Sequence, residues 1–140
     1  MMRLLMTMFV FSNAAMGAIG DSYEAVLARF REPPVKETKE KDGTIGLEFK
    51  KGDEWVLVAI RGGSVFMEVY TGVDLKMAES IFRAQDSDWK PVEKKGGHLG
   101  AWMSKRGWKA VYRDEDNDSP DKRIRGPVLI IMDPSRKSPD

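Results

Sequence analysis

The chain has 140 residues, with 23 Lys and Arg, 22 Asp and Glu, and no cysteine. This balance of charge argues against a nucleic-acid-binding surface, which normally contains clustered basic residues, and the lack of cysteine excludes disulfides, thiolate zinc sites and lipid attachment through cysteine. The length is enough for one domain with one hydrophobic core and too short for two ordinary domains.

The first 18 residues have the pattern of a signal peptide. Arg3 gives a short positive region, residues 4–11 are uncharged and mostly apolar, and the small residues that follow allow cleavage between Gly17 and Ala18. The apolar run is far shorter than the about 20 residues that a transmembrane helix needs. We therefore predict a protein that is exported, periplasmic or secreted, and soluble after cleavage; an ordinary buried N-terminal helix is the alternative.

Removal of this segment changes the charge balance. Arg3 is its one charged residue, so the basic count falls from 23 to 22 while the acidic count stays at 22, and the net charge becomes zero. The predicted mature chain therefore has no electrostatic preference for nucleic acid.

Residues 20–34 predict the first helix. Asp21 or Ser22 can cap its start, because a short polar side chain accepts a hydrogen bond from a free backbone N–H. Pro33 and Pro34 are expected to end it. One apolar face follows from the spacing i, i+3, i+4 and i+7 of four residues: Tyr23, Val26, Leu27 and Phe30.

Two groups of strands are predicted on either side of a second helix. Residues 45–50 alternate apolar and polar positions, residues 55–60 are apolar throughout and predict a central strand, and residues 64–70 complete an antiparallel meander. Asp74 can cap the second helix. The segments that follow predict a hairpin and a last strand: residues 101–104, 108–113 and 127–132.

This order predicts an α+β fold, α-βββ-α-βββ, with antiparallel strands and both helices packed on one face. It is compatible with a tandem of two αβββ units or with a single six-stranded sheet. We expect one domain over residues 19–132 and a disordered tail over residues 133–140.

The first helix segment resembles that of small bacterial envelope domains of the BamE/SmpA type and of the β-lactamase-inhibitor-like fold. The resemblance covers residues 20–34 and the strand order that follows, and its matching positions are Gly20, Ser22, Val26, Phe30 and Pro33. Arg31 stands where those families often have glycine, and the lipid-attachment cysteine of the BamE group is missing. The resemblance implies an exported, non-catalytic domain that binds other proteins, and it assigns no binding residues.

Aromatic residues in the second hairpin are the candidate binding site. Trp108 and Tyr112 alternate onto one face of a strand, and Trp102 lies on the preceding one. An exposed face would form an aromatic platform for a sugar or a protein. If the second helix covers these residues, they belong to the core instead.

The acidic loop at residues 114–121 is a weak candidate for a calcium site. Asp114, Asp116 and Asp118 alternate as oxygen ligands could. The positions that need glycine and glutamate in an EF-hand loop hold Ser119 and Arg125, so a solvated loop without metal is the preferred interpretation.

Taken together, these patterns predict a small exported, non-catalytic domain that binds another protein in the periplasm or outside the cell. It would need no cofactor, no nucleic acid and no transmembrane anchor. The alternative is a small exported hydrolase or carbohydrate-binding module that acts on glycans, using a carboxylate pair or the tryptophans.

Overall fold

The computed structural model describes residues 19–92, 99–114, 120–124 and 126–135. The predicted signal peptide, residues 1–18, and residues 136–140 of the predicted tail lie outside this part of the chain.

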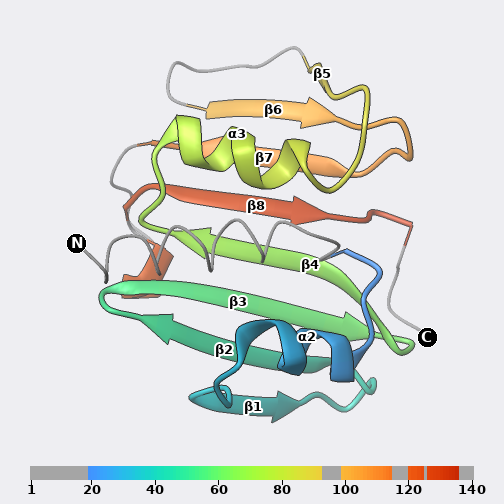
Figure 1. Cartoon of the computed structure of the whole chain (residues 1–140), viewed down its shortest axis with the longest axis vertical. Helices are drawn as coiled ribbons and strands as arrows, with labels where there is room; N and C mark the ends of the chain where they lie inside the picture. The colour runs from blue at the N-terminus through green and yellow to red at the C-terminus, as the bar shows by residue number, and fades with distance from the viewer. Residues whose placement is uncertain (1–18, 93–98, 115–119, 125, 136–140) are drawn as a thin grey trace.

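Eight strands form a single antiparallel sheet in the order β1-β2-β3-β4-β8-β7-β6-β5 (Figure 1). Two meanders of four strands meet where β4 pairs with β8, with Val69 opposite Ile130. The strands are β1 (Lys36–Lys39), β2 (Ile45–Lys51), β3 (Glu54–Arg61), β4 (Ser64–Thr71), β5 (Lys90–Pro91), β6 (Leu99–Met103), β7 (Lys109–Arg113) and β8 (Val128–Met132).

The predicted α+β class, with two αβββ units, is therefore wrong, and so is the single six-stranded sheet. Strands account for 41% of the described residues and helices for 19%. Each half of the chain contributes four strands, and hydrogen bonds between β4 and β8 join all eight into one sheet. The prediction missed β1 because all four of its residues are polar and exposed, and it missed β5 because that strand has only two residues, one of them Pro91.

The first helix, α2 (Tyr23–Phe30), begins as predicted at Ser22, whose side chain accepts a hydrogen bond from the backbone N–H of Ala25 at 3.2 Å. It ends before the two prolines, at Arg31, which adopts the left-handed conformation with φ 59°. Its buried residues are Val26 and Phe30, and the Phe30 ring stacks on that of Phe49 in β2 at 4.0 Å between centroids.

The second helix, α3 (Leu75–Arg83), begins at Asp74, whose carboxylate accepts a hydrogen bond from the backbone N–H of Met77 at 2.8 Å. It buries three residues, of which Phe82 is the last. The centroid of the Phe82 ring lies 4.9 Å from that of Trp89 and 4.8 Å from that of Trp102. A short 3₁₀ helix, η1 (Lys122–Ile124), precedes β8.

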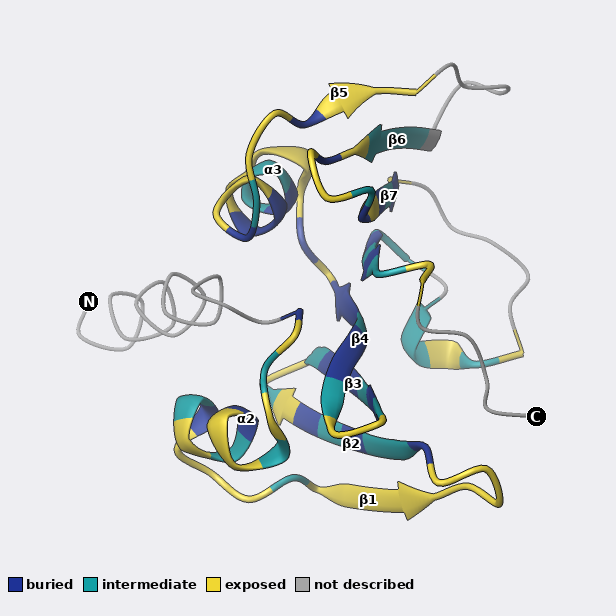
Figure 2. Ribbon diagram, turned by 90° about the vertical axis from the view of Figure 1, so that its right-hand side faces the viewer, coloured by how far each residue is buried: buried dark blue, intermediate teal, exposed yellow. Residues whose placement is uncertain are grey.

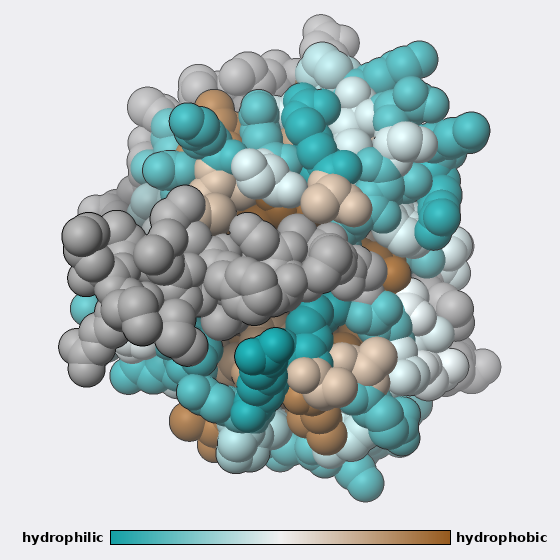
Figure 3. Space-filling view, in the orientation of Figure 1, coloured by the Kyte–Doolittle hydropathy of each residue, from teal (hydrophilic) through white to brown (hydrophobic). Residues whose placement is uncertain are grey.

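The two faces of the sheet have different surroundings. Figure 2 shows α2 and α3 on one side, which we call the helix face, and η1 on the other, which we call the open face. One cross-strand row on the helix face is fully buried: Leu47, Val58, Glu68, Ile131 and Ala110. Seen from the helix side, the outer surface around α3 is largely hydrophilic (Figure 3), and the helix buries Ala78, Ile81 and Phe82.

Candidate functional site

A groove of about 250 Å³ lies on the open face, over β2, β3 and β4. Its floor is built from small and apolar residues: Gly46, Leu57, Ala59, Met67 and Val69. Polar and charged residues stand at its border: Thr38, Glu40, Glu48 and Arg123. The groove therefore combines an apolar floor with a charged rim, as a binding pocket for apolar groups does.

The floor follows from the composition of β3. Successive residues of a strand point to opposite faces, so Val56, Val58 and Ile60 are buried on the helix face while Leu57 and Ala59 lie half-buried on the open face. An antiparallel sheet with one solvated face normally carries polar residues on that face. This strand is apolar on both faces, so its open face carries apolar side chains where a solvated face normally carries polar ones.

The apolar surface continues beyond the groove. Residues directly opposite each other in β3, β4, β8 and β7 form an apolar row: Leu57, Val69, Ile130 and Val111. Val69 is buried, and the other three are half-buried. On β6, Met103 is 39% exposed. The groove is thus one end of an apolar surface that crosses the sheet.

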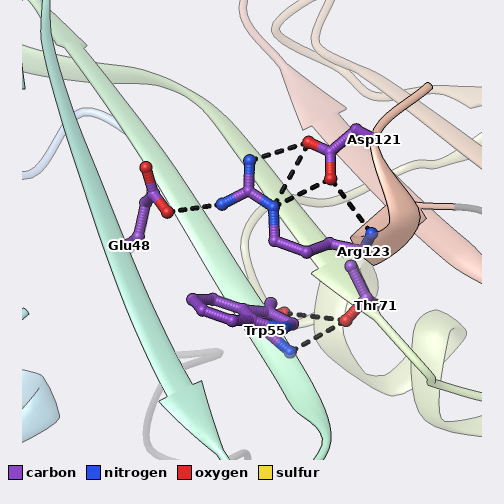
Figure 4. A network of polar contacts seen from close by, with 5 residues as sticks. All are labelled: Glu48, Trp55, Thr71, Asp121 and Arg123. Atoms are coloured by element: carbon purple, nitrogen blue, oxygen red, sulfur yellow. Dashed lines mark hydrogen bonds and ion pairs between the residues drawn. The ribbon is translucent and has the colours of Figure 1, made fainter. Parts of the chain in front are cut away.

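Arg123, in η1, forms the charged wall of the groove (Figure 4). Its Nη1 donates to Oε1 of Glu48 in β2, and its Nη2 and Nε donate to the carboxylate of Asp121 at 2.7 and 2.9 Å. Its guanidinium lies 5.3 Å from the ring centroid of Trp55 in β3. We call Glu48, Asp121 and Arg123 the clasp, because they fasten η1 to the sheet.

The clasp also fixes the local charges. Hydrogen bonds from Arg123 lower the pKa of Asp121, which stabilises its ionised form. Trp55 is held in turn by Thr71, whose hydroxyl oxygen accepts a hydrogen bond from the Trp55 backbone N–H at 2.8 Å. The charged wall is therefore held by contacts with both β2 and Asp121.

The groove offers an apolar floor and few ionisable side chains. Its ionisable groups are Glu40, Glu48 and Arg123, and Glu48 is already engaged by Arg123. Among residues 19–92, 99–114, 120–124 and 126–135, no group of three or more His, Cys, Asp or Glu side chains is arranged to hold a metal ion. What the site can do is bury apolar groups and orient them by the charges at its rim.

The predicted aromatic site lies elsewhere, on the helix face. Trp108 and Tyr112 are buried, and the Tyr112 hydroxyl donates to the backbone oxygen of Val73 at 2.9 Å. Trp102 is partly buried and packs against Phe82 of α3. The structure thus brings these aromatics together in the core, and the rings of Trp108 and Tyr112 form no exposed platform.

The predicted acidic site is described only in part. Asp114 is exposed just after β7, whereas Asp116 and Asp118 lie outside the described residues.

Sequence reasoning missed the groove and the clasp. One signal was present, because residues 55–60 are apolar at every position, which indicates a strand with two apolar faces. The contact between Arg123 and Glu48 joins residues 75 positions apart, and no local spacing indicates it.

Comparisons with known proteins do not show a family for this chain. No protein-family model matches it, and no curated protein matches it. Solved structures that match include a cysteine-rich secretory protein from Staphylococcus aureus, with 12% identity and a TM-score of 0.46 over 88% of this chain. This chain spans 49% of the length of that protein. No helix in the described residues is long and apolar enough to cross a membrane.

Proposed function

We propose that this chain is an exported, non-catalytic domain that binds another protein through the groove and the adjoining apolar row. The observation that carries the proposal is the half-exposed apolar floor on the open face, formed by Leu57, Ala59 and Met67. Contiguous apolar surface of this kind marks interaction sites on soluble domains.

The size of the groove favours a side chain over a small molecule. Its about 250 Å³ falls below the roughly 300–1,000 Å³ of typical small-ligand pockets. That volume accommodates one or two large apolar side chains, and such anchors supply most of the binding free energy in protein interfaces. Glu40 at the rim offers a negative charge that orients the partner, whereas Arg123 already shares its positive charge between Glu48 and Asp121.

Glycan binding is less well supported. Sugar-binding sites use exposed aromatic rings, but Trp108 and Tyr112 are buried. The ring of Trp55 already interacts with two cations, Lys50 at 5.4 Å and Arg123 at 5.3 Å from its centroid, and these would compete with a sugar for the ring. Protein binding therefore remains the better proposal.

Gly46 offers a direct test, because it lines the groove and an added Cβ would have no heavy atom within 4 Å. Gly46→Phe should fill the groove without disturbing the backbone, while Gly46→Ala fills little of it. The tagged full chain and both variants would be used to recover proteins from the exported fraction of the native host. A partner retained by the parent and by Gly46→Ala, and lost with Gly46→Phe, is the expected result.

Two results would contradict the proposal. One is equal recovery of every partner by the parent and Gly46→Phe. The other is recovery of no specific partner together with binding or cleavage in a glycan panel. Light scattering of the parent tests whether a second copy of this chain occupies the groove. Self-association that Gly46→Phe abolishes would identify the partner as that second copy.

A further inference from the structure

Glu68 is a carboxylic acid in the centre of the sheet. It lies on β4, points to the helix face and is fully buried. Its direct neighbours on the two adjacent strands, Val58 and Ile131, are apolar and buried. Burial of an ionised carboxylate in such a place is unfavourable unless a cation and hydrogen bonds compensate it.

The contacts of Glu68 connect segments from both halves of the chain. Its Oε1 accepts hydrogen bonds from the Tyr70 hydroxyl at 2.9 Å and from Nε2 of Gln85, after α3, at 3.1 Å. Its Oε2 faces Nη2 of Arg29, in α2, at 3.3 Å. The Gln85 amide oxygen in turn accepts from the backbone N–H of Ile19 at 3.3 Å. Glu68 therefore links α2, the end of α3 and the chain before α2.

The cluster contains one cation for two carboxylates. Nη1 of Arg29 lies 2.6 Å from Oδ2 of Asp21, closer than Nη2 lies to Glu68. With both acids ionised, the group carries a net negative charge in a largely buried setting. The side chain of Asp21 is 26% exposed and that of Glu68 is 0% exposed, so water can stabilise a charge on Asp21 but not on Glu68. The cost of burying a negative charge therefore falls on Glu68, and a proton on that carboxylate relieves it.

We propose that Asp21, Arg29 and Glu68 form a proton-dependent latch that holds α2 and residues 19–21 on the sheet when Glu68 is neutral and loosens them when it ionises. This inference does not depend on the proposed binding function.

The pH range in which Glu68 gains or loses its proton supports the latch. Burial raises the pKa of Glu68 to about 7 from an ordinary 4.5, with Arg29, Tyr70 and Gln85 acting in the opposite direction. Burial also raises the pKa of Tyr70, which keeps its hydroxyl neutral over the same range. Asp21, Arg29 and Tyr70 are the ionisable groups that act on Glu68 among the described residues. The latch would respond near neutral pH.

Local stability decides which element moves. Helix α2 has eight residues and buries Val26 and Phe30, whereas α3 buries three residues and Phe82 contacts two tryptophan rings. Residues 20 and 21 are attached to the sheet by two backbone hydrogen bonds with Val65. Less burial means a smaller free energy of local opening, so the strain of an ionised Glu68 is released at α2.

Hydrogen exchange of the full chain tests the latch, with rates corrected for the intrinsic effect of pH. Between about pH 6 and about pH 8, we expect local opening of residues 19–30 to increase about tenfold, which corresponds to one pKa unit. Residues 75–83 should respond much less. Glu68→Gln should abolish the increase, while Glu79→Gln, on α3 beside Arg83, should leave it intact.

Asp21→Asn gives an independent readout. It removes the second carboxylate that binds Arg29, so Arg29 interacts with Glu68 only. The pKa of Glu68 should then fall, and the midpoint of the pH response should move to lower pH. The same pH response in Glu68→Gln as in the parent, or an equal response in residues 75–83, would overturn the latch. If Glu68→Gln does not fold, Asp21→Asn decides, and an unshifted midpoint overturns the proposal.

Discussion

The two faces of the sheet are made by the same strands but differ in what they do. In β3, Val58 on the helix face is buried in the hydrophobic core, while its neighbour Leu57 lies half-buried on the open face. Both are apolar, so composition alone does not distinguish them. The difference lies in what covers them among the described residues: α2 and α3 lie over the helix face, whereas Leu57 on the open face stays half-buried.

Phe82→Ala should produce the largest loss, because it removes a ring from the fully covered face. Phe82 is completely buried and contacts Trp89 and Trp102. We expect the free energy of unfolding to fall by about 3–5 kcal/mol, as measured by urea denaturation. Met103→Ala, on the open face, is the control and should cost less than about 1 kcal/mol. Equal losses would remove the distinction between the faces.

The pH dependence of stability should show the next largest effect. Because the pKa of Glu68 is about 7 in the folded chain and 4.5 ordinarily, the folded state binds more protons than the unfolded state between these values. Stability is therefore greatest below the unfolded pKa and is lost as the pH rises through the folded one, by up to roughly 3 kcal/mol.

Glu68→Gln should flatten this profile, and the difference from the parent should be clearest above pH 7, where the variant is the more stable. Denaturation at a series of pH values measures it. Parallel profiles for parent and variant would show that Glu68 has no such role.

Arg123→Ala tests the clasp, which covers only part of the open face. The loss of its contacts with Glu48 and Asp121 should lower the free energy of unfolding by about 1 kcal/mol or less, because all three side chains are partly exposed. Hydrogen exchange of residues 121–124 should increase. Lys122→Ala, at an exposed neighbouring position, should change neither quantity, and the same increase in both variants would contradict the clasp.

Met67→Gln should have the smallest effect on folding and a clear effect on binding. Met67 is half-buried in the groove floor, so its replacement by a polar chain of similar length should change stability by about 0.5 kcal/mol or less. Affinity for a partner found with the parent chain should fall about tenfold or more. Loss of stability without loss of affinity would place this residue in the core.

The sequence indicated local elements better than their assembly. Alternation located β2, and the apolar run Trp55 to Ile60 located β3, which lies between β2 and β4 as a central strand does. Ser22 as the helix cap was also readable, because capping depends on the next three residues. The pairing of β4 with β8 was not, since it joins distant segments, and the class prediction failed there.

The same limit applies to the candidate site. The predicted strand began one residue too early, because β7 starts at Lys109 and Trp108 precedes it. Only the position of α3 determines that the face that carries Tyr112 is covered. The groove depends on the register of β2, β3 and β4 and on η1 arriving from residues 122–124. A functional surface built from paired strands cannot be read from any one of them.

The margins of the sheet matter for a protein that exposes apolar surface. Within the described residues, β1 and β5 each pair with one strand of the sheet, so a strand of another copy could add to their outer edges and begin a fibre. Lys36 and Lys39 place positive charge along β1, and β5 ends after two residues at Pro91, which has no N–H to donate. These two margins resist strand addition, so the open face can remain uncovered without committing the chain to aggregation.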